Sequence, residues 1–292
     1  MLCDNAEAAL IMDSPAIGHR SRKERRMPMA KCYEELQFTD DFMFGKVMED
    51  KELCRDVLEC LLGQPVGELR DVHTEKQLQY TADGKPIRLD VYTRDHKAVY
   101  DAEMQNLNHR RLEDLELPKR SRFYQSMMDV DYLQKGGSYQ RLPEGKVLII
   151  CTFDPFGEGK AKYVFENRCE DKPELSLKDG TAKIFYNCTC LSGKMSEELR
   201  SFYDFILTGV GSDALTRRIA SAVSRARRNE KWRSEYMKEL LLRADARAEG
   251  RAEAIRGFVQ DKLEDGIDRE TIIRKLEKVY SMTREEAEKY LS

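Results

Sequence analysis

Acidic and amide side chains recur at every second position near the end of the segment 87–106. Asp101, Glu103 and Gln105 alternate there with apolar residues, and Asp90 precedes them on a separate run. Alternate residues of a β-strand point to the same face, so a strand would gather these side chains on one side. Carboxylate oxygens are ligands that Mg²⁺ and Mn²⁺ prefer, and such an ion can activate water toward a phosphate. The spacing therefore indicates a divalent-metal site.

A β-hairpin would bring Asp90 to the same place. Residues 87–93 alternate, so that Asp90 lies on the face opposite Leu89 and Val91. A turn at 94–97 returns the chain, which places Asp90 opposite residues 101–103. Carboxylates this close raise one another's pKa unless a cation lies between them. An alternative stays open, because acidic residues on the solvent face of an edge hairpin are common without any site.

Helices and further strands must position this hairpin. Residues 40–63 have the apolar spacing of one helix or of two abutting helices, and residues 68–80 follow as a strand. Pro118 fits the first turn of a helix that runs to about Gln134. Residues 146–153 form the continuous apolar run typical of a strand buried on both faces. The order α-β-β-β-α-β predicts an α/β or α+β core.

The rest of the chain predicts an added β section and a helical extension. The expected elements are a β section over 162–190, helices over 196–208 and 213–264, and two short helices beginning near Asp268 and Thr283. We therefore expect a disordered leader over 1–30, a main domain over 31–210 and a helical C-terminal extension over 211–292.

Several segments, in this order, resemble one known family. They read FTDDFMFGKVM, LDVYTRD, YDAEMQ, LPKRSRFYQSMMD and VLIICTFDPFG. They are similar to the Rpn family of recombination-promoting nucleases and transposases, within the PD-(D/E)XK nuclease superfamily. The resemblance covers residues 31–190 and extends more loosely to 209. It implies a restriction-endonuclease-like core and a divalent-metal-dependent DNA endonuclease that uses Mg²⁺ or Mn²⁺.

The resemblance assigns roles to the hairpin residues. Asp90 and Glu103 match the metal-binding carboxylates, and Gln105 stands where the wider superfamily has Lys. The E-x-Q form is usual in the Rpn family, but an amide can only position water and phosphate through hydrogen bonds, whereas Lys would add a positive charge. A catalytically weak or inactive DNA-binding accessory protein that keeps the nuclease fold is therefore the alternative.

Two more residues match family motifs outside the hairpin. Asp41 matches the acidic position of the first-helix motif, as an outer metal ligand or water-positioning group; a plain N-cap is the alternative. Arg120 matches the arginine of the second-helix motif and shares a helix face with Tyr124. It could clamp a phosphate or carboxylate, or form only a surface ion pair.

Composition and charge exclude some classes of protein and of binding partner. The net charge is −3 and 41% of residues are hydrophobic, which excludes a globally basic coat protein and a wholly disordered chain. No apolar run reaches membrane-span length and no signal-peptide pattern begins the chain, so we expect no membrane partner and a cytoplasmic location. DNA is the expected partner, and a homodimer is left open. Cysteine and histidine spacings predict no metal site.

A basic stretch opens the C-terminal extension. Its cations could lie along DNA phosphates or simply face solvent; they are Arg217, Arg218, Arg225, Arg227, Arg228, Lys231 and Arg233. The last two helices have the outline of a helix-turn-helix, with a capping box formed by Thr283 and Glu286. Acidic residues in the final helix argue against insertion into a major groove, and we expect a protein-contact or auxiliary module.

Overall fold

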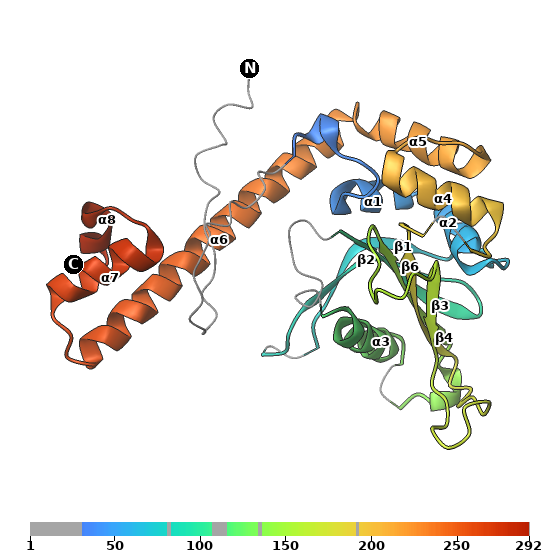
Figure 1. Ribbon diagram of the computed structural model, residues 1–292, viewed down its shortest axis with the longest axis horizontal. Coiled ribbons are helices and arrows are strands. Elements are labelled where there is room, and N and C mark those ends of the chain that lie inside the picture. Colours follow the sequence, from blue (N-terminus) through green and yellow to red (C-terminus); the bar gives the residue numbers. More distant parts are fainter. Residues whose placement is uncertain (1–30, 81–82, 107–115, 134–135, 191–192, 292) are drawn as a thin grey trace. The chain divides into compact units, whose positions relative to one another are not determined.

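The computed structural model describes residues 31–80, 83–106, 116–133, 136–190 and 193–291 (Figure 1). One compact unit spans Glu34–Asn229, and a second contains residues 31–33 and the chain from Glu230 onward. Within the described ranges, no helix is both long enough and apolar enough to cross a membrane. The expected leader, 1–30, falls outside these ranges, and the domain boundaries expected after residues 30 and 210 stay predictions.

A mixed six-stranded sheet forms the centre of the first unit. Its strands are β1 (Val72–Leu78), β2 (Ile87–Arg94), β3 (Ala98–Gln105), β4 (Glu144–Cys151), β5 (Lys162–Phe165) and β6 (Thr181–Asn187). They lie in the order β1-β2-β3-β4-β6-β5. The pairs β1–β2, β2–β3 and β5–β6 are antiparallel, whereas β3–β4 and β4–β6 are parallel. The β2–β3 hairpin is thus an interior part of the sheet.

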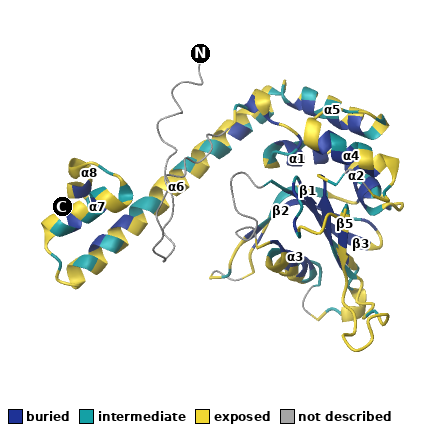
Figure 2. Ribbon diagram, in the orientation of Figure 1, coloured by how far each residue is buried: buried dark blue, intermediate teal, exposed yellow. Residues whose placement is uncertain are grey.

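Helices cover both faces of this sheet. One face is covered by α1 (Asp41–Met48), α2 (Lys51–Leu62) and α4 (Glu197–Thr208), and the other by α3 (Leu117–Tyr132) (Figure 1). α5 (Ala214–Ala226) packs on α1, α2 and α4. Short 3₁₀ turns lie at Tyr33–Glu35 and Tyr139–Arg141. Buried residues gather on the sheet and on the helix faces turned toward it (Figure 2). The predicted α+β fold with the order α-β-β-β-α-β is confirmed.

Residues 40–63 form two helices rather than one. The Asp50 side chain accepts hydrogen bonds from the backbone N–H groups of Glu52 and Leu53 and so caps α2. At the other end, Gly63 has a φ of 69°, the left-handed conformation in which glycine commonly ends a helix. The cap at Asp50 explains why the continuous apolar periodicity does not make a single long helix.

The face covered by α3 has an apolar core with an acidic edge. Val147 and Ile149 of β4 pack there in one cluster with Val99 of β3 and with Met127 and Met128 of α3. Because alternate residues of β3 share a face, Asp101, Glu103 and Gln105 lie on the same side as Val99. The helix that closes the core therefore also covers the acidic side chains.

The second unit is helical. It contains α6 (Glu230–Glu264), α7 (Arg269–Tyr280) and α8 (Arg284–Lys289). The end of α6 packs with α7 and α8 around a small core that includes Ile255, Val259, Ile272 and Leu276. Thr283 and Glu286 form the predicted capping box at the start of α8.

The single helix predicted over 213–264 is wrong. α5 ends at Ala226, a short turn follows, and α6 begins at Glu230. α5 buries Ile219 and Val223 within the first unit. The break between the helices is not visible in the sequence because good helix formers continue across it.

Candidate active site and metal centre

The β2–β3 hairpin opens where its two carboxylates meet. The strands pair regularly from Arg94–Val99 to Val91–Ala102. Beyond that pair, the backbone N–H of Asp90 donates to Glu103 Oε1 at 2.9 Å, and the backbone N–H of Met104 donates to Asp90 Oδ2 at 3.2 Å. Each carboxylate is thus anchored to the opposite strand through one oxygen. The second oxygen of each takes no part in this anchoring.

These acids are buried, so the alternative of a solvent-facing acidic surface is wrong. Asp90 is 8% exposed, Glu103 is 2% exposed and Asp101 is fully buried. The sheet order explains this burial, because β2 and β3 lie inside the sheet and α3 packs across their face. The sequence pattern alone could not distinguish a covered hairpin from an edge hairpin.

Burial and mutual repulsion raise the pKa of all three carboxyls. For Asp90 and Asp101, desolvation is the largest cause, followed by the charge of Glu103 on Asp90 and of Asp90 on Asp101. Desolvation and the charge of Asp101 raise the pKa of Glu103. Neither oxygen of Asp101 has a hydrogen-bond partner among the described residues. The site therefore concentrates negative charge that a bound cation would stabilise.

Arg120 connects this acidic group to the amide of Gln105. Its guanidinium donates to Gln105 Oε1 at 3.0 Å and to the Tyr124 hydroxyl at 2.9 Å, and it lies 3.5 Å from Glu103 Oε2. Because a guanidinium only donates, Gln105 must present its oxygen to Arg120 and keeps its amide hydrogens for another acceptor. Arg120 is therefore more than a surface ion pair, since Glu103 and Tyr124 are both buried.

Asp41 lies at the entrance to the site. It is the first residue of α1, whose N-cap is Asp40, so the N-cap alternative for Asp41 is wrong. Its carboxylate lies 3.6 Å from the Arg88 guanidinium, which also pairs with Glu75 at 2.9 Å. The negative charge of Asp41 contributes to the raised pKa of Asp90. Asp41 thus belongs to an outer layer of charge around the buried carboxylates.

The five candidate residues line one cavity of about 670 Å³. They are Asp41, Asp90, Glu103, Gln105 and Arg120. Sequence reasoning missed other residues on its wall, among them Lys85, Arg88, Asn106, Lys119 and Phe123. Helical spacing could have indicated two of these, because Lys119 and Phe123 are four residues apart and adjoin Arg120 and Tyr124 on α3. Lys85 lies just before β2 and had no such signal.

The donor set fits a hard divalent cation. No group of three His, Cys, Asp or Glu side chains converges as a metal cage within the described part of the chain. Mg²⁺ does not require such a cage, because it commonly binds through one or two carboxylates while water and substrate phosphates complete its shell. Asp90 and Glu103 would supply that pair, and the charge of Asp101, whose oxygens accept no hydrogen bond from a described residue, would favour a cation beside them.

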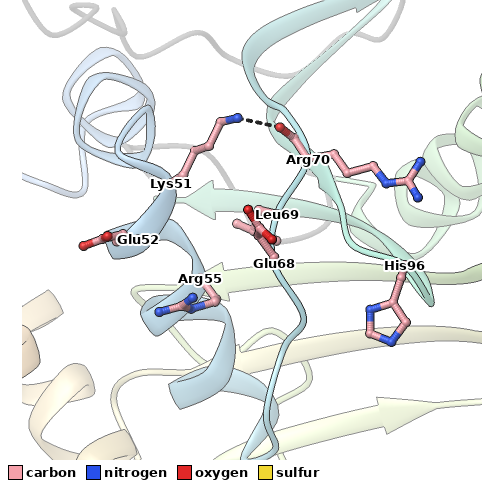
Figure 3. Close-up of a pocket in the computed structure, with 7 residues that line it drawn as sticks. All are labelled: Lys51, Glu52, Arg55, Glu68, Leu69, Arg70 and His96. Atoms are coloured by element: carbon pink, nitrogen blue, oxygen red, sulfur yellow. Dashed lines mark hydrogen bonds between the residues drawn. The ribbon is translucent and has the colours of Figure 1, made fainter.

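A second hollow lies at the other end of the hairpin, between α2 and the β2–β3 turn. Its volume is about 810 Å³, and its lining includes Lys51, Arg55, Arg70 and His96. Lys51 Nζ donates to the main-chain oxygen of Arg70 at 2.5 Å, and the other charged side chains point apart (Figure 3). This hollow brings no two carboxylates together, whereas Asp90 and Glu103 meet in the first cavity.

An interior hairpin with facing carboxylates, covered by a helix that supplies an arginine, defines a restriction-endonuclease-like protein. Residues 38–180 match the family described as PD-(D/E)XK nuclease family transposase. The domain that they form belongs to the PD-(D/E)XK superfamily. Nucleases of this superfamily generally use divalent metals, and the family implies DNA as the substrate. The chain matches no curated protein and no solved structure.

Proposed function

We propose that the protein is a divalent-metal-dependent DNA endonuclease that hydrolyses phosphodiester bonds, of the mobile-element or recombination-promoting type. The observation that supports this most strongly is the opening of the β2–β3 ladder at Asp90 and Glu103. A structural hairpin has no reason to bury facing carboxylates whose pKa values are raised by burial and by the charge of a neighbouring acid. A nuclease requires that arrangement to hold its metal beside a phosphate.

In this proposal Asp90 and Glu103 hold Mg²⁺ or Mn²⁺. The ion, when bound, would lower the pKa of a water ligand and stabilise negative charge on the attacked phosphate. Asp41 would act from outside the first ring of ligands, by orienting water at the cavity entrance. The exposed lysines Lys85 and Lys119 would hold phosphates of the DNA strand, because ammonium groups at the cavity wall attract its backbone.

Gln105 and Arg120 act together in place of the superfamily lysine. The Gln105 oxygen is held by Arg120, which leaves the amide hydrogens to orient the attacking water or a phosphate oxygen. Arg120 supplies the positive charge that the neutral amide lacks, and Tyr124 fixes the guanidinium from its other side. Charge and positioning are thus divided between two side chains.

A non-catalytic DNA-binding accessory protein with the same fold is the second candidate. It is favoured by the proximity of Arg120 to Glu103 Oε2, 3.5 Å apart. A cation already beside this carboxylate reduces the site's affinity for a metal ion, and the wider superfamily's lysine is absent.

Cleavage of supercoiled plasmid DNA separates the two candidates. We expect the purified full-length protein to nick plasmid with Mg²⁺ or Mn²⁺ and not with EDTA, and we expect Asp90→Asn to remove the nicking. Arg122→Lys is the matched control, since Arg122 is exposed on α3 and does not line the cavity. If the wild type binds DNA but never nicks it with either ion, the accessory function is correct.

A further inference from the structure

Phe123 lies on the side of α3 that lines the carboxylate cavity. The other large apolar side chains of this helix that enter the core include Leu117, Tyr124, Met127 and Met128. Phe123 instead lines the carboxylate cavity and is 39% exposed. It makes no ring contact with another aromatic side chain among the described residues. The exposed part of this ring is therefore available to a ligand that enters the cavity.

Lys119 accompanies this ring. It lies one helical turn before Phe123, on the same cavity wall, and residues at this spacing have Cβ atoms about 5–6 Å apart. Lys119 is exposed and forms no ion pair with a described residue, unlike Lys76, which pairs with Asp131. A flat ring and an uncompensated ammonium group therefore stand together beside the carboxylates.

This pair matches the chemistry of one nucleotide. An aromatic ring stacks on a base, and a lysine contacts a phosphate. In a continuous duplex both faces of each base are covered by its neighbours, so a protein ring can stack only on a base that has left the helix or never entered it. A cavity of about 670 Å³ falls in the range of small-molecule sites, which is wide enough for a single nucleotide.

We propose that Phe123 and Lys119 bind an unpaired nucleotide next to the phosphate that Asp90 and Glu103 address. The preferred substrate is then single-stranded or locally unpaired DNA rather than continuous duplex. The position of this nucleotide beside the cleaved bond rests on the proposed nuclease function. The stacking itself does not, because it needs neither metal nor cleavage.

Binding in EDTA tests the stacking. Fluorescence anisotropy would compare a short single strand, the matching duplex, and the duplex with a few unpaired bases at its centre. For Phe123→Leu, we expect the Kd for single-stranded and locally unpaired DNA to rise about tenfold, while the Kd for continuous duplex changes less than about twofold. Phe123→Trp should retain the wild-type Kd values. Tyr139→Leu is the control, because Tyr139 is 83% exposed outside the cavity.

A base analogue gives a direct readout. The fluorescence of 2-aminopurine in the single strand should be quenched by the wild type and by Phe123→Trp, and not by Phe123→Leu. Lys119→Gln should flatten the slope of log affinity against log salt by about 0.7 on single strands. Lys172→Gln, at an exposed lysine outside the cavity, should leave it unchanged.

Three results would overturn the proposal. These are an equal loss on single strand and duplex with Phe123→Leu, the same loss with Tyr139→Leu, and no binding of either DNA by the wild type. Failure of the nuclease function is a separate result, because it is read from plasmid nicking with metal and leaves these binding measurements intact.

Discussion

The two ends of the β2–β3 hairpin both bury carboxylates, with opposite results. At the turn, Asp95 is 7% exposed, and its oxygens accept hydrogen bonds from the backbone N–H groups of Gly67, Lys97 and Ala98 and from the Tyr100 hydroxyl. Burial pushes its pKa up, but these donors outweigh it and lower the pKa. At the open end, Asp90, Asp101 and Glu103 are also buried, but their pKa values are raised.

The difference separates a carboxylate that is paired within the protein from the carboxylates of the proposed metal site. The oxygens of Asp95 are paired with backbone and hydroxyl donors, so its carboxylate holds the turn against the segment between α2 and β1. Asp90, Asp101 and Glu103 have fewer donors than oxygens, so their charges oppose folding unless a cation joins them. Substitutions at the two ends should therefore act on different properties.

Glu103→Gln should have the largest effect on activity. It removes one ligand charge from the metal, and we expect nicking to fall about a hundred- to a thousandfold. The melting temperature should stay or rise, because the substitution also removes a buried, repelled charge. Initial rates on plasmid DNA and thermal unfolding measure the two properties, and a large fall in melting temperature would place Glu103 with Asp95 as a structural acid.

Asp95→Asn should show the reverse pattern. The amide cannot replace a carboxylate toward several N–H donors, so we expect a loss of about 2–4 kcal/mol in unfolding free energy and little change in activity per folded molecule. The folded-state pKa of Asp95 is lowered, so its stabilisation exists above the ordinary carboxyl pKa and disappears in acid. Denaturant unfolding should therefore show the variant approaching the wild type below about pH 4.

Arg120→Lys should have a moderate effect. A lysine keeps the charge but cannot hold Gln105 and Tyr124 together as the guanidinium does, and we expect kcat to fall about tenfold. The pH-rate profile should keep its shape, because Asp90 and Glu103 are unchanged. A rate equal to that of Arg122→Lys would show that Arg120 supplies charge alone.

Asp101→Asn should have the smallest effect on activity, because Asp101 is not one of the two proposed metal ligands, and its main effect should be on stability. Because the folded-state pKa of Asp101 is raised, the wild type loses stability as the pH rises above the ordinary carboxyl pKa, and the variant avoids this loss. The variant's advantage should be absent near pH 4 and grow toward pH 8, with about 2–4 °C in melting temperature for each kcal/mol gained. A constant difference between the two proteins across this range would contradict a buried, uncompensated charge at Asp101.

The sequence predicted the hairpin and its register because both follow from a period of two. Asp90 was expected opposite residues 101–103, and its contact with Glu103 agrees. The depth of the site could not be predicted, since burial depends on α3 and on β4 pairing with β3, which are distant in the chain. The Arg120–Gln105 bond was missed for the same reason.

The roles of Asp41, Asp90, Glu103, Gln105 and Arg120 stay predictions, as does the oligomeric state.

In the C-terminal helices, the sequence predicted a local feature but not a boundary between helices. Their capping box was predicted from local residue types at Thr283 and Glu286, and it is present. The break between α5 and α6 depends on which unit each helix packs with, and local patterns do not contain that information.

Titration of Mn²⁺ into the metal-free full-length protein near neutral pH tests the central claim most directly. Calorimetry on the wild type and Asp95→Asn should show binding of the ion, with release of protons from carboxyls whose pKa is raised. Asp90→Asn and Glu103→Gln should lose this binding while remaining folded. Equal affinity in all four proteins would contradict a metal site at the open end of the hairpin.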